Sequence, residues 1–492
     1  MKKARWITAL FTAIFMVFNF AACSLFGDDD DDDSGSSSSS SKQSSDWLIL
    51  SYFDADSAAK CLNDDLFDDM LNEQLALYDI AQTSGSPSVR ILALWDGASR
   101  TACQAKNHTR IHPSAALYEL GGMSANEGLL ISKSASFQVS SATKDLTDSV
   151  LWLSPEPDMG DVATLRSFLT WAAENYSASN IVLMLSDHGA GTVYETISGG
   201  LQTAFNSSRT LCSDDTNGSG LELSALDVKN AIKQSGLSIK VIWQDCCLQG
   251  TAENAYILRG SADYLVASEN SAYSGNHYSV ISSLKSSSSP LSFAKAVVKA
   301  YADRHYSNIL EDETGFEAML TQAVYNLSST KQEALYTAIN NLSNALLKDG
   351  SDVCKDVFDE YLYGGITFTG TYNSLSDIGY FCKELIDDAA CGVSDETKAA
   401  AQTVVNALSD IIECAWIGKK TSSSLSFYYC KNLDGYSGLH DSDGVFGLTI
   451  TSASNVNKTY YPLYSDYSEY SAVTGYAPNW GKLLKLWNSH NL

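Results

Sequence analysis

Short runs of Val, Ile, Leu and aromatic residues recur along this chain, and segments with a helical repeat of apolar positions separate them. The runs have the length of buried strands and cover residues 47–53, 89–95, 181–185, 239–243 and 263–268. The helical patterns between them cover residues 65–81, 164–176 and 223–235. Strands that alternate with helices of about 10 to 15 residues indicate a parallel sheet covered on both faces. We therefore predict an α/β fold with a mainly parallel sheet flanked by helices.

The pattern changes near residue 290. Ala- and Leu-rich helical segments follow at 333–347 and 396–412, strand-like segments at 424–429 and 445–451, and a final helix at 480–487. These segments predict a largely helical C-terminal region over 291–492 that closes with strands. The first folded domain is then expected over 46–290.

The N-terminus has the three parts of an export signal. Lys2, Lys3 and Arg5 precede an apolar core at 9–20 that is too short for a comfortable membrane span. The core ends in Phe-Ala-Ala before Cys23, which resembles the bacterial lipoprotein box. We therefore predict a lipoprotein signal peptide over 1–22 and a lipid on Cys23. The alternative is an ordinary signal peptide cleaved after the small residues.

Residues 23–45 contain six consecutive Asp residues and then a Ser-rich stretch. Such a segment buries no apolar surface and its charges repel one another, so it is expected to be a flexible tether. The expected location is the bacterial cell envelope, with the protein lipid-anchored to a membrane. Exposure on the cell surface remains an open alternative.

The chain has 492 residues, of which 45% are hydrophobic and 18% charged, so it is long and apolar enough to bury a large core. Its formal net charge is −26. Such a charge repels nucleic acid and anionic membrane surfaces and favours cationic substrates.

The eleven Cys residues are widely spread, and none forms a C-x-x-C pair or a zinc-like cluster. We expect most of them to be buried small hydrophobic residues. Pairing among some of them stays open, the candidates being Cys61, Cys103, Cys212, Cys354, Cys382, Cys391, Cys414 and Cys430.

Two of the predicted strands lead directly into residues of nucleophilic catalysis, His188 and Cys247. Because the carboxyl ends of parallel strands share one edge of the sheet, the two side chains are expected to meet there. Gly189 leaves room for a substrate carbonyl, and the N–H groups of Gly189 and Cys247 would form an oxyanion hole. The alternative, from spacing alone, is a structural His and a core Cys.

At these residues the chain resembles the clostripain family of cysteine peptidases, which has a caspase-like fold. The resemblance is carried by residues 156–176, by Ser-Asp-His-Gly-Ala-Gly at 186–191, and by Gln-Asp-Cys-Cys-Leu at 244–248 with Glu253 and Tyr256. It implies a cysteine endopeptidase that acts on peptides or proteins. It also implies that Cys247 is the nucleophile, because the family places the Cys two residues after the Asp. Cys246 is then expected in the core, with a vicinal disulfide as the alternative.

The resemblance further implies a substrate pocket that prefers Arg or Lys. Asp245 is expected to line it, on the argument that it shares the facing of Cys247 along an extended strand, and Glu269 is a candidate second acid. Gln249 replaces the usual Met of the family, and residues 275–278 depart from its usual pattern.

Family members are often activated by internal cleavage, and here the only basic residue between His188 and Lys229 is Arg209. It lies in a polar, Gly- and Ser-rich segment, so we expect self-cleavage after Arg209. No cofactor is expected to be required. Calcium is an alternative at Asp214, Asp215 and Asn217, although their spacing does not follow a full calcium-loop pattern.

A second hypothesis from another class is a catalytically silent caspase-like surface lipoprotein that serves binding or adhesion. A third keeps the peptidase but gives it acidic specificity. The joint presence of His188, Gly189, Asp245 and Cys247 favours catalysis over a binding module. The carboxylate of Asp245 would repel an acidic substrate side chain, which favours basic specificity.

Overall fold

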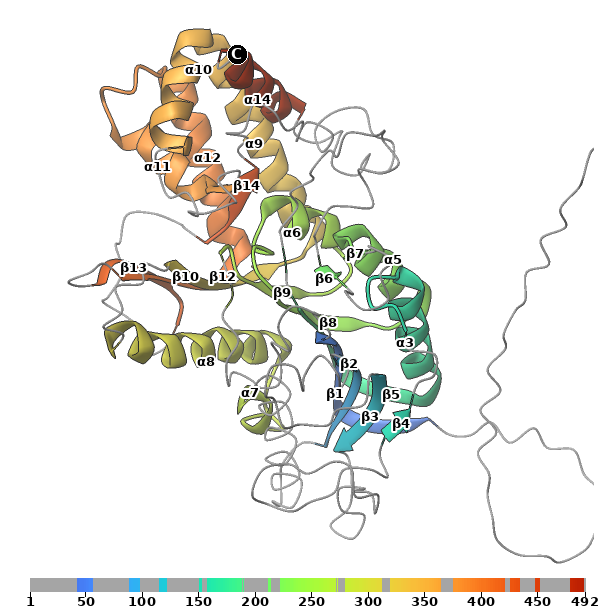
Figure 1. The fold of residues 1–492 in the computed structure, drawn as a ribbon. Helices are drawn as coiled ribbons and strands as arrows, with labels where there is room; N and C mark the ends of the chain where they lie inside the picture. The colour runs from blue at the N-terminus through green and yellow to red at the C-terminus, as the bar shows by residue number, and fades with distance from the viewer. Residues whose placement is uncertain are drawn as a thin grey trace, which may run out of the picture. The chain divides into compact units, whose positions relative to one another are not determined.

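A ten-stranded sheet runs through the folded unit, which begins at Lys42 (Figure 1). The computed structural model describes residues 42–55, 88–97, 115–121, 150–152, 157–187, 189, 211–213, 222–270, 272, 279–311, 319–363, 375–420, 425–433, 447–451 and 478–490. The strands of the large sheet are β1 (Gln43–Ala55), β2 (Val89–Gly97), β3 (Ala115–Gly121), β4 (Val150–Trp152), β5 (Tyr176–Ser186), β8 (Ile239–Asp245), β9 (Tyr264–Ala267), β10 (Met319–Asn326), β12 (Ile412–Lys420) and β13 (Leu425–Lys431).

The order of these strands is β13-β12-β10-β9-β8-β5-β1-β2-β3-β4. The central strands β9, β8, β5, β1 and β2 are parallel to one another, and the strands added at both edges are antiparallel. The parallel strands reverse their order between β1 and β5, so their carboxyl ends open a crevice at that point of the sheet. The predicted α/β class with a mainly parallel central sheet is confirmed.

Helices cover both faces of the sheet (Figure 1). They are α3 (Val162–Asn175), α5 (Ala225–Ser235), α6 (Ala252–Leu258), α7 (Ser279–Ser282), α8 (Pro290–Glu311), α9 (Ser329–Asp349), α10 (Ser351–Val357), the π-helical turn η1 (Phe358–Tyr363), α11 (Ile378–Asp387), α12 (Asp395–Ile411) and α14 (Pro478–His490). Two small two-stranded sheets pair β11 (Leu375–Asp377) with β14 (Thr449–Thr451), and β6 (Leu211–Ser213) with β7 (Glu222–Leu223).

Side chains alternate along β1, so this strand contributes to a hydrophobic core on each face of the sheet. Leu48, Leu50 and Tyr52 pack in the same cluster as Leu165 and Leu169 of α3 and Val228 of α5. Trp47, Ile49 and Phe53 point the other way and share a cluster with Phe293, Val297 and Tyr301 of α8. Successive side chains of a strand face opposite sides, so a strand buried on both faces has a continuous apolar sequence. This explains the unbroken runs in the sequence.

Local signals set where the helices begin. Asp161 caps α3 by accepting from the N–H of Ala163, and Ser224 forms a capping box with Asp227 at the start of α5. The helix predicted over 223–235 therefore begins two residues later, since Leu223 belongs to β7. At the other end of α3, Tyr176 already belongs to β5, so helix and strand join without a loop.

The C-terminal region contributes more strand than the sequence predicts. β10 pairs with β9, β12 with β10, and β13 with β12, all antiparallel, so the large sheet continues across the predicted boundary at residue 290. The predicted division into 46–290 and 291–492 is wrong in this respect, and residues 42–492 form one compact unit. The predicted strand at 445–451 is also shorter, since β14 covers only Thr449–Thr451 and lies in a separate sheet.

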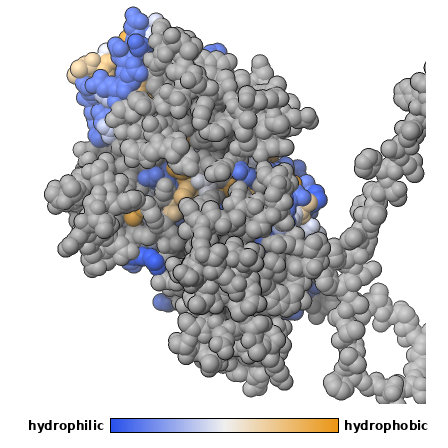
Figure 2. Space-filling view, viewed as in Figure 1, coloured by the Kyte–Doolittle hydropathy of each residue, from blue (hydrophilic) through white to orange (hydrophobic). Residues whose placement is uncertain are grey.

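The helices of this region were largely predicted: α9, α12 and α14 fall on the three helical segments of the sequence. At the upper left, where Figure 1 places the C-terminal helices, Figure 2 shows a mostly hydrophilic surface with a small apolar area at its edge. Within the described residues, no helix combines the length and the apolar character that crossing a bilayer requires.

The folded chain also begins earlier than expected. Residues 43–45, predicted as the end of the tether, belong to β1 and pair with residues 176–178 of β5, and the Lys42 ammonium donates to Ala173 O at 2.7 Å. Pairing with β5 explains the correction, since a polar segment joins a sheet when a neighbouring strand supplies its backbone partners. The predicted signal peptide, Cys23, residues 23–41 of the tether and the helix at 65–81 lie outside the described residues.

Candidate active site

The chain turns sharply where β8 ends at the carboxyl-end rim of the sheet. Asp245 is the last strand residue, and residues 246–250 form what is here called the Cys247 turn. Leu248 is fully buried and has a φ of 61°, a left-handed conformation that is uncommon for a residue with a side chain. Its N–H donates to Asn270 O at 2.9 Å, and the N–H of Gly250 donates to Ser268 O at 2.7 Å. The segment that follows β9 therefore holds the turn in its strained shape.

The sulfur of Cys247 lies against the same segment. The N–H of Ala272 lies 3.3 Å from Cys247 Sγ, and Sγ lies 3.7 Å from Ala272 O. The Cys247 side chain is half-buried, unlike its buried neighbours in the turn. A backbone N–H directed at a sulfur stabilises its thiolate form, because hydrogen bonding to a charged form favours that form.

Gly189 makes the closest backbone approach to the Cys247 turn. A Cβ built on Gly189 would stand 2.3 Å from Cys247 O, 2.9 Å from Cys246 Cβ and 2.9 Å from Gln249 Nε2. Only a glycine permits this approach. β5 and β8 are aligned so that Ser186 pairs with Asp245, which brings the chain beyond both strands to the same place.

His188 itself lies outside the described residues, although Asp187 before it and Gly189 after it are described. The prediction that His188 and Cys247 meet therefore stays a prediction. What the structure brings together is the residue after the His and the Cys247 turn.

Cys246 is buried, as expected, with its thiol 3.4 Å from Leu185 O. Burial, and then the carboxylates of Asp187 and Asp245, raise the pKa of the Cys246 thiol well above its usual value, so Cys246 stays protonated. The alternative of a vicinal disulfide is wrong, because Cys246 and Cys247 are both free thiols.

The other described cysteines are free as well, and pairing among them is not seen. They are Cys212, Cys354, Cys382, Cys391, Cys414 and Cys430, while Cys61 and Cys103 lie outside the described residues. All are buried except Cys391, which is half-buried. They are the small hydrophobic core residues that the sequence predicts.

Asp245 stands at the rim beside the Cys247 turn, with 8% of its surface exposed. The argument that Asp245 and Cys247 share one facing along an extended strand is wrong, because β8 ends at Asp245 and Leu248 reverses the chain. Asp245 remains close to Cys246, whose pKa it raises. A nearly buried carboxylate at this position is a candidate partner for a cationic side chain.

Glu269 is the residue predicted to be a second acid in the substrate pocket. It is 1% exposed, and its carboxyl faces that of Asp377 in the interior. Its role as a second acid in the substrate pocket stays a prediction, and the structure places Glu269 in the interior beside Asp377 of β11. The N–H of Glu269 donates to Thr321 Oγ1 of β10 at 2.8 Å.

The sequence did not indicate a buried polar network beneath the turn. The amide of Asn254 on α6 donates to Gln244 Oε1 at 2.6 Å and to Gln249 O at 2.7 Å, and the amide of Gln249 donates to Cys247 O at 3.3 Å. All three side chains of this network are at most 2% exposed. The local signal for this network is the Thr-x-x-Asn cap of α6, in which Thr251 accepts from the N–H of Asn254.

The segment after the predicted cleavage site is tied to the same rim. Leu211 forms an antiparallel bridge with Gly189, and Leu211 and Cys212 are at most 2% exposed. Arg209 and the calcium candidates Asp214, Asp215 and Asn217 lie outside the described residues. Among the residues that are described, no group of three or more His, Cys, Asp or Glu residues could hold a metal ion.

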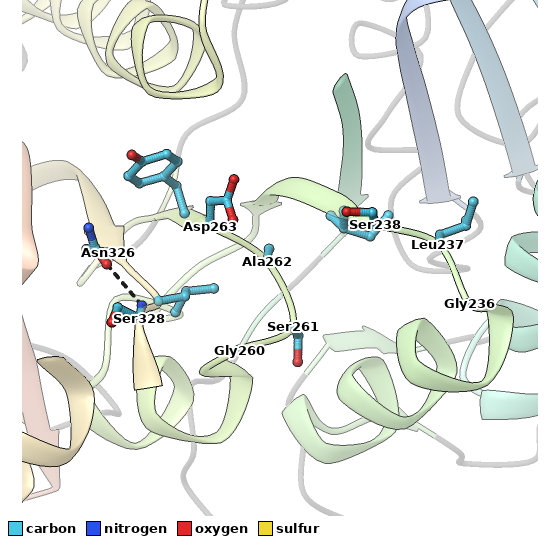
Figure 3. Close-up of a pocket in the computed structure, with 12 residues that line it drawn as sticks. Gly236, Leu237, Ser238, Gly260, Ser261, Ala262, Asp263, Asn326 and Ser328 are labelled. Atoms are coloured by element: carbon cyan, nitrogen blue, oxygen red, sulfur yellow. Dashed lines mark hydrogen bonds between the residues drawn. The ribbon is translucent and has the colours of Figure 1, made fainter. Parts of the chain in front are cut away.

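A cavity of about 640 Å³ lies at the opposite end of the strands (Figure 3). Its walls are the loop 236–238 before β8, the loop 260–263 before β9, and the end of β10, where the N–H of Ser328 donates to Asn326 Oδ1 at 3.0 Å. Open parallel sheets bind ligands at the carboxyl ends of their strands. The rim with Cys247, rather than this cavity, is therefore the candidate site.

Comparison with known proteins shows what this chain is similar to. The model of the clostripain family matches residues 66–487. Clostripain from Hathewaya histolytica is 29% identical over 192 residues, which are 37% of this chain and 33% of that protein. The match thus spans about a third of the length of this curated relative.

Solved structures show the same fold at low identity. A secreted C11 cysteine protease from Bacteroides thetaiotaomicron in complex with an irreversible peptide inhibitor has a TM-score of 0.51 and 15% identity, covering 87% of this chain and 98% of that chain. A second structure of a secreted C11 cysteine protease from the same organism has a TM-score of 0.51 and 13% identity, with 87% and 99% covered.

Proposed function

The chain belongs to the clostripain family of cysteine peptidases, and from that premise we propose that it is a cysteine endopeptidase whose nucleophile is Cys247 and whose general base is His188. The observation that carries this proposal is the contact between Gly189 and the Cys247 turn, where a Cβ would stand 2.3 Å from Cys247 O. His188 immediately precedes Gly189 in the chain. A His and a Cys on neighbouring strand ends supply the two groups that thiol catalysis needs.

In the proposed mechanism, His188 takes the proton of the Cys247 thiol and the thiolate attacks the peptide carbonyl carbon. The N–H groups of Gly189 and Cys247 hold the developing oxyanion. His188 then donates the proton to the leaving amine, which leaves an acyl group on Cys247. Water, deprotonated by His188, releases that acyl group. The N–H of Ala272, 3.3 Å from Cys247 Sγ, supports the thiolate before attack.

The proposed substrates are peptides and proteins cut after Arg or Lys. Asp245 supports this preference, since it is a nearly buried carboxylate at the end of β8, two residues before the nucleophile. A charged pair in a partly desolvated site discriminates more strongly than a pair in water. Glu269 has no part in this proposal.

The enzyme is further proposed to cleave itself after Arg209. In support, Leu211, two residues beyond Arg209, bridges Gly189 at the rim, so the chain on the carboxyl side of the scissile bond is held beside the Cys247 turn. Proximity of this kind favours cleavage within one molecule. The buried Leu211 and Cys212 would keep the new N-terminal segment attached after the cut.

The proposed setting is the bacterial cell envelope, with the protein anchored to a membrane by a lipid on Cys23. The polar tether would place the peptidase away from that membrane. Calcium, if it acts, would support structure and take no part in the thiol chemistry. Loss of membrane association in a Cys23→Ser variant, measured by fractionation of expressing cells, tests the anchor.

The test of the catalytic proposal compares residues 42–492 as wild type, Cys247→Ala and Cys246→Ala under reducing conditions. The assay is hydrolysis of reporter peptides with Arg, Lys or Asp before the cleaved bond. We expect hydrolysis after Arg or Lys by the wild type and the Cys246→Ala control, and none by Cys247→Ala. Hydrolysis by folded Cys247→Ala, or silence of the folded wild type, would overturn the proposal and favour a binding module.

An Arg209→Gln variant tests self-processing in the same preparation. The wild type should yield two fragments whose new N-terminus is Thr210, identified by mass spectrometry, and Arg209→Gln should stay a single chain. A single-chain wild type that cleaves peptides would contradict self-processing and leave the peptidase proposal intact.

A further inference from the structure

Two carboxyl groups from distant parts of the chain meet in the interior behind the Cys247 turn. Glu269 follows β9, Asp377 ends β11, and each is 1% exposed. Their side chains are hydrogen-bonded to each other. Two buried carboxyls in contact cannot both be ionised at low cost, so the pair shares a proton.

Asp377 is the ionised member of the pair. Its Oδ1 accepts from the N–H of Tyr380 at 2.8 Å, where Asp377 caps α11, and its Oδ2 accepts from the N–H of Gly447 at 2.9 Å. Among the described residues, no N–H group and no hydroxyl donates to either oxygen of Glu269. The proton therefore resides on Glu269, which donates it to Asp377.

The backbone around Glu269 holds the Cys247 turn from one side. Ser268 O accepts from Gly250 N–H and Asn270 O accepts from Leu248 N–H, so the residues on both sides of Glu269 bind the turn. The N–H of Glu269 itself is fixed by Thr321 Oγ1 at 2.8 Å. Three residues after Glu269, the N–H of Ala272 lies 3.3 Å from the sulfur of Cys247.

The backbone near Asp377 holds the turn from the other side. Gly447, which donates to Asp377, also accepts a hydrogen bond from the buried hydroxyl of Tyr325, and the N–H of Thr449 donates to Gly250 O at 3.0 Å. The added Cβ of an alanine at position 250 would stand 2.5 Å from that hydroxyl. The acid pair thus joins the two segments between which the Cys247 turn is held.

We propose that Glu269 is a positioning residue for the reaction: as a neutral carboxylic acid bound to Asp377, it holds residues 268–270 and Ala272 against the Cys247 turn. This inference rests on the proposed role of Cys247 as the nucleophile. Glu269 itself is only 1% exposed. It acts through the backbone that shapes the turn and directs the Ala272 N–H at the thiolate.

Titration of the Glu269–Asp377 pair should make the activity depend on pH. Burial raises the pKa of Asp377 to about 6 and that of Glu269 well above its usual value. Among the described residues, the other titratable groups that face the pair are Tyr325 of β10 and Cys382 of α11. Burial raises the pKa of both, so they stay neutral with the pair. Loss of the Glu269 proton at alkaline pH would place two like charges in the interior and push the two segments apart.

The test uses the wild type, Glu269→Gln and Glu269→Ala, with Asp263→Asn as a control that removes a half-exposed carboxylate beside β9. Two quantities are measured from pH 5 to 10: kcat/KM for an Arg reporter peptide, and the rate at which iodoacetamide alkylates Cys247, followed by the mass of the Cys247 peptide. Alkylation reports the environment of the sulfur without requiring turnover. Thermal unfolding confirms that each variant is folded.

We expect Glu269→Gln to keep kcat/KM within about threefold near pH 7, because its amide N–H donates to Asp377 as the neutral acid does. The wild type should lose kcat/KM at alkaline pH, and Glu269→Gln should not show this decline. Glu269→Ala should lower both kcat/KM and the alkylation rate at least about tenfold. Wild-type pH profiles in Glu269→Gln, or wild-type rates in Glu269→Ala, would overturn the proposal.

A Thr321→Val variant keeps the inference testable where a Glu269 variant does not fold. It removes the acceptor of the Glu269 N–H and should slow alkylation of Cys247 while leaving the pH dependence unchanged. The two proposals also fail differently. Peptide cleavage that persists in Cys247→Ala refutes the nucleophile, whereas alkylation that is insensitive to Glu269 and Thr321 refutes the positioning role.

Discussion

A methyl group added at Gly189 would enter the most crowded point of the candidate active site. The Cβ of Gly189→Ala would stand 2.3 Å from Cys247 O, where an ordinary carbon-to-oxygen contact is about 3.3 Å or more. Cys246 Cβ and Gln249 Nε2, each at 2.9 Å, block the neighbouring directions. The two backbone segments must therefore separate by about 1 Å.

That displacement would act on the groups proposed to carry the chemistry, because Gly189 follows His188 and its N–H is one of the two proposed oxyanion donors. A misplacement of about 1 Å can cost about 100-fold in rate. We therefore expect Gly189→Ala to lower kcat/KM about 100-fold, which corresponds to about 2.7 kcal/mol of transition-state stabilisation.

The assay is kcat/KM for an Arg reporter peptide, with the midpoint of thermal unfolding measured on the same preparations. Gly418→Ala on β12 is the matched control, since the three nearest described atoms to its added Cβ all belong to the ring of Trp416, the closest at 3.1 Å. Gly418→Ala should change the unfolding midpoint by a few degrees at most and leave kcat/KM near the wild-type value. A folded Gly189→Ala with kcat/KM within threefold of wild type would refute the reasoning.

Three further predictions concern the framework around the site. Trp480→Ala should cost about 3 to 5 kcal/mol of unfolding free energy in urea, because Trp480 is fully buried with its ring against Phe358 and Phe381; a loss below 1 kcal/mol would contradict this. Tyr325→Phe should cost about 1 to 3 kcal/mol in the same assay by leaving Gly447 O without its hydroxyl donor, and an unchanged urea midpoint would argue against that hydrogen bond. The pKa of Asp377 is raised from 3.8 to about 6, and that of Glu269 is also raised, so the folded state holds these protons more tightly than the unfolded state. The stability that the protons contribute is fully present below about pH 4 and is lost as pH rises through 6. For Asp377 the loss of unfolding free energy is at most about 3 kcal/mol. The urea midpoint should therefore fall less between pH 4.5 and 8 in Glu269→Gln than in the wild type. Equal falls in the two proteins would show that the pair does not share a proton.

The main parts of the site were predictable because they lie on strands whose apolar character is continuous. The strand segments 181–185 and 239–243 are buried on both faces, so their continuous apolar sequences predict strands. Because these strands are parallel, their carboxyl ends lie side by side. The placement of Gly189 against Cys247 follows from that rule. Cys246 was expected in the core because side chains alternate along a strand, so two adjacent cysteines cannot both face the site.

Other features depend on contacts between residues far apart in the chain. The strand β12 follows α12 directly, and its first residues continue the apolar pattern of the helix, so no local signal separates them. Pairing with β10 and β13 makes residues 412–420 a strand. The role of Glu269 is likewise decided by Asp377, more than a hundred positions later in the sequence.

The sequence by itself determined the α/β class and the two strands, β5 and β8, that lead toward His188 and Cys247. These features follow from apolar periodicity, which is a local property of the chain. Tertiary structure alone decided that the sheet continues past residue 290, that Leu248 reverses the chain, and that Glu269 lies inside the protein. Such features arise when backbone and side-chain groups distant in sequence satisfy one another's hydrogen bonds, and no local pattern records which partners will meet.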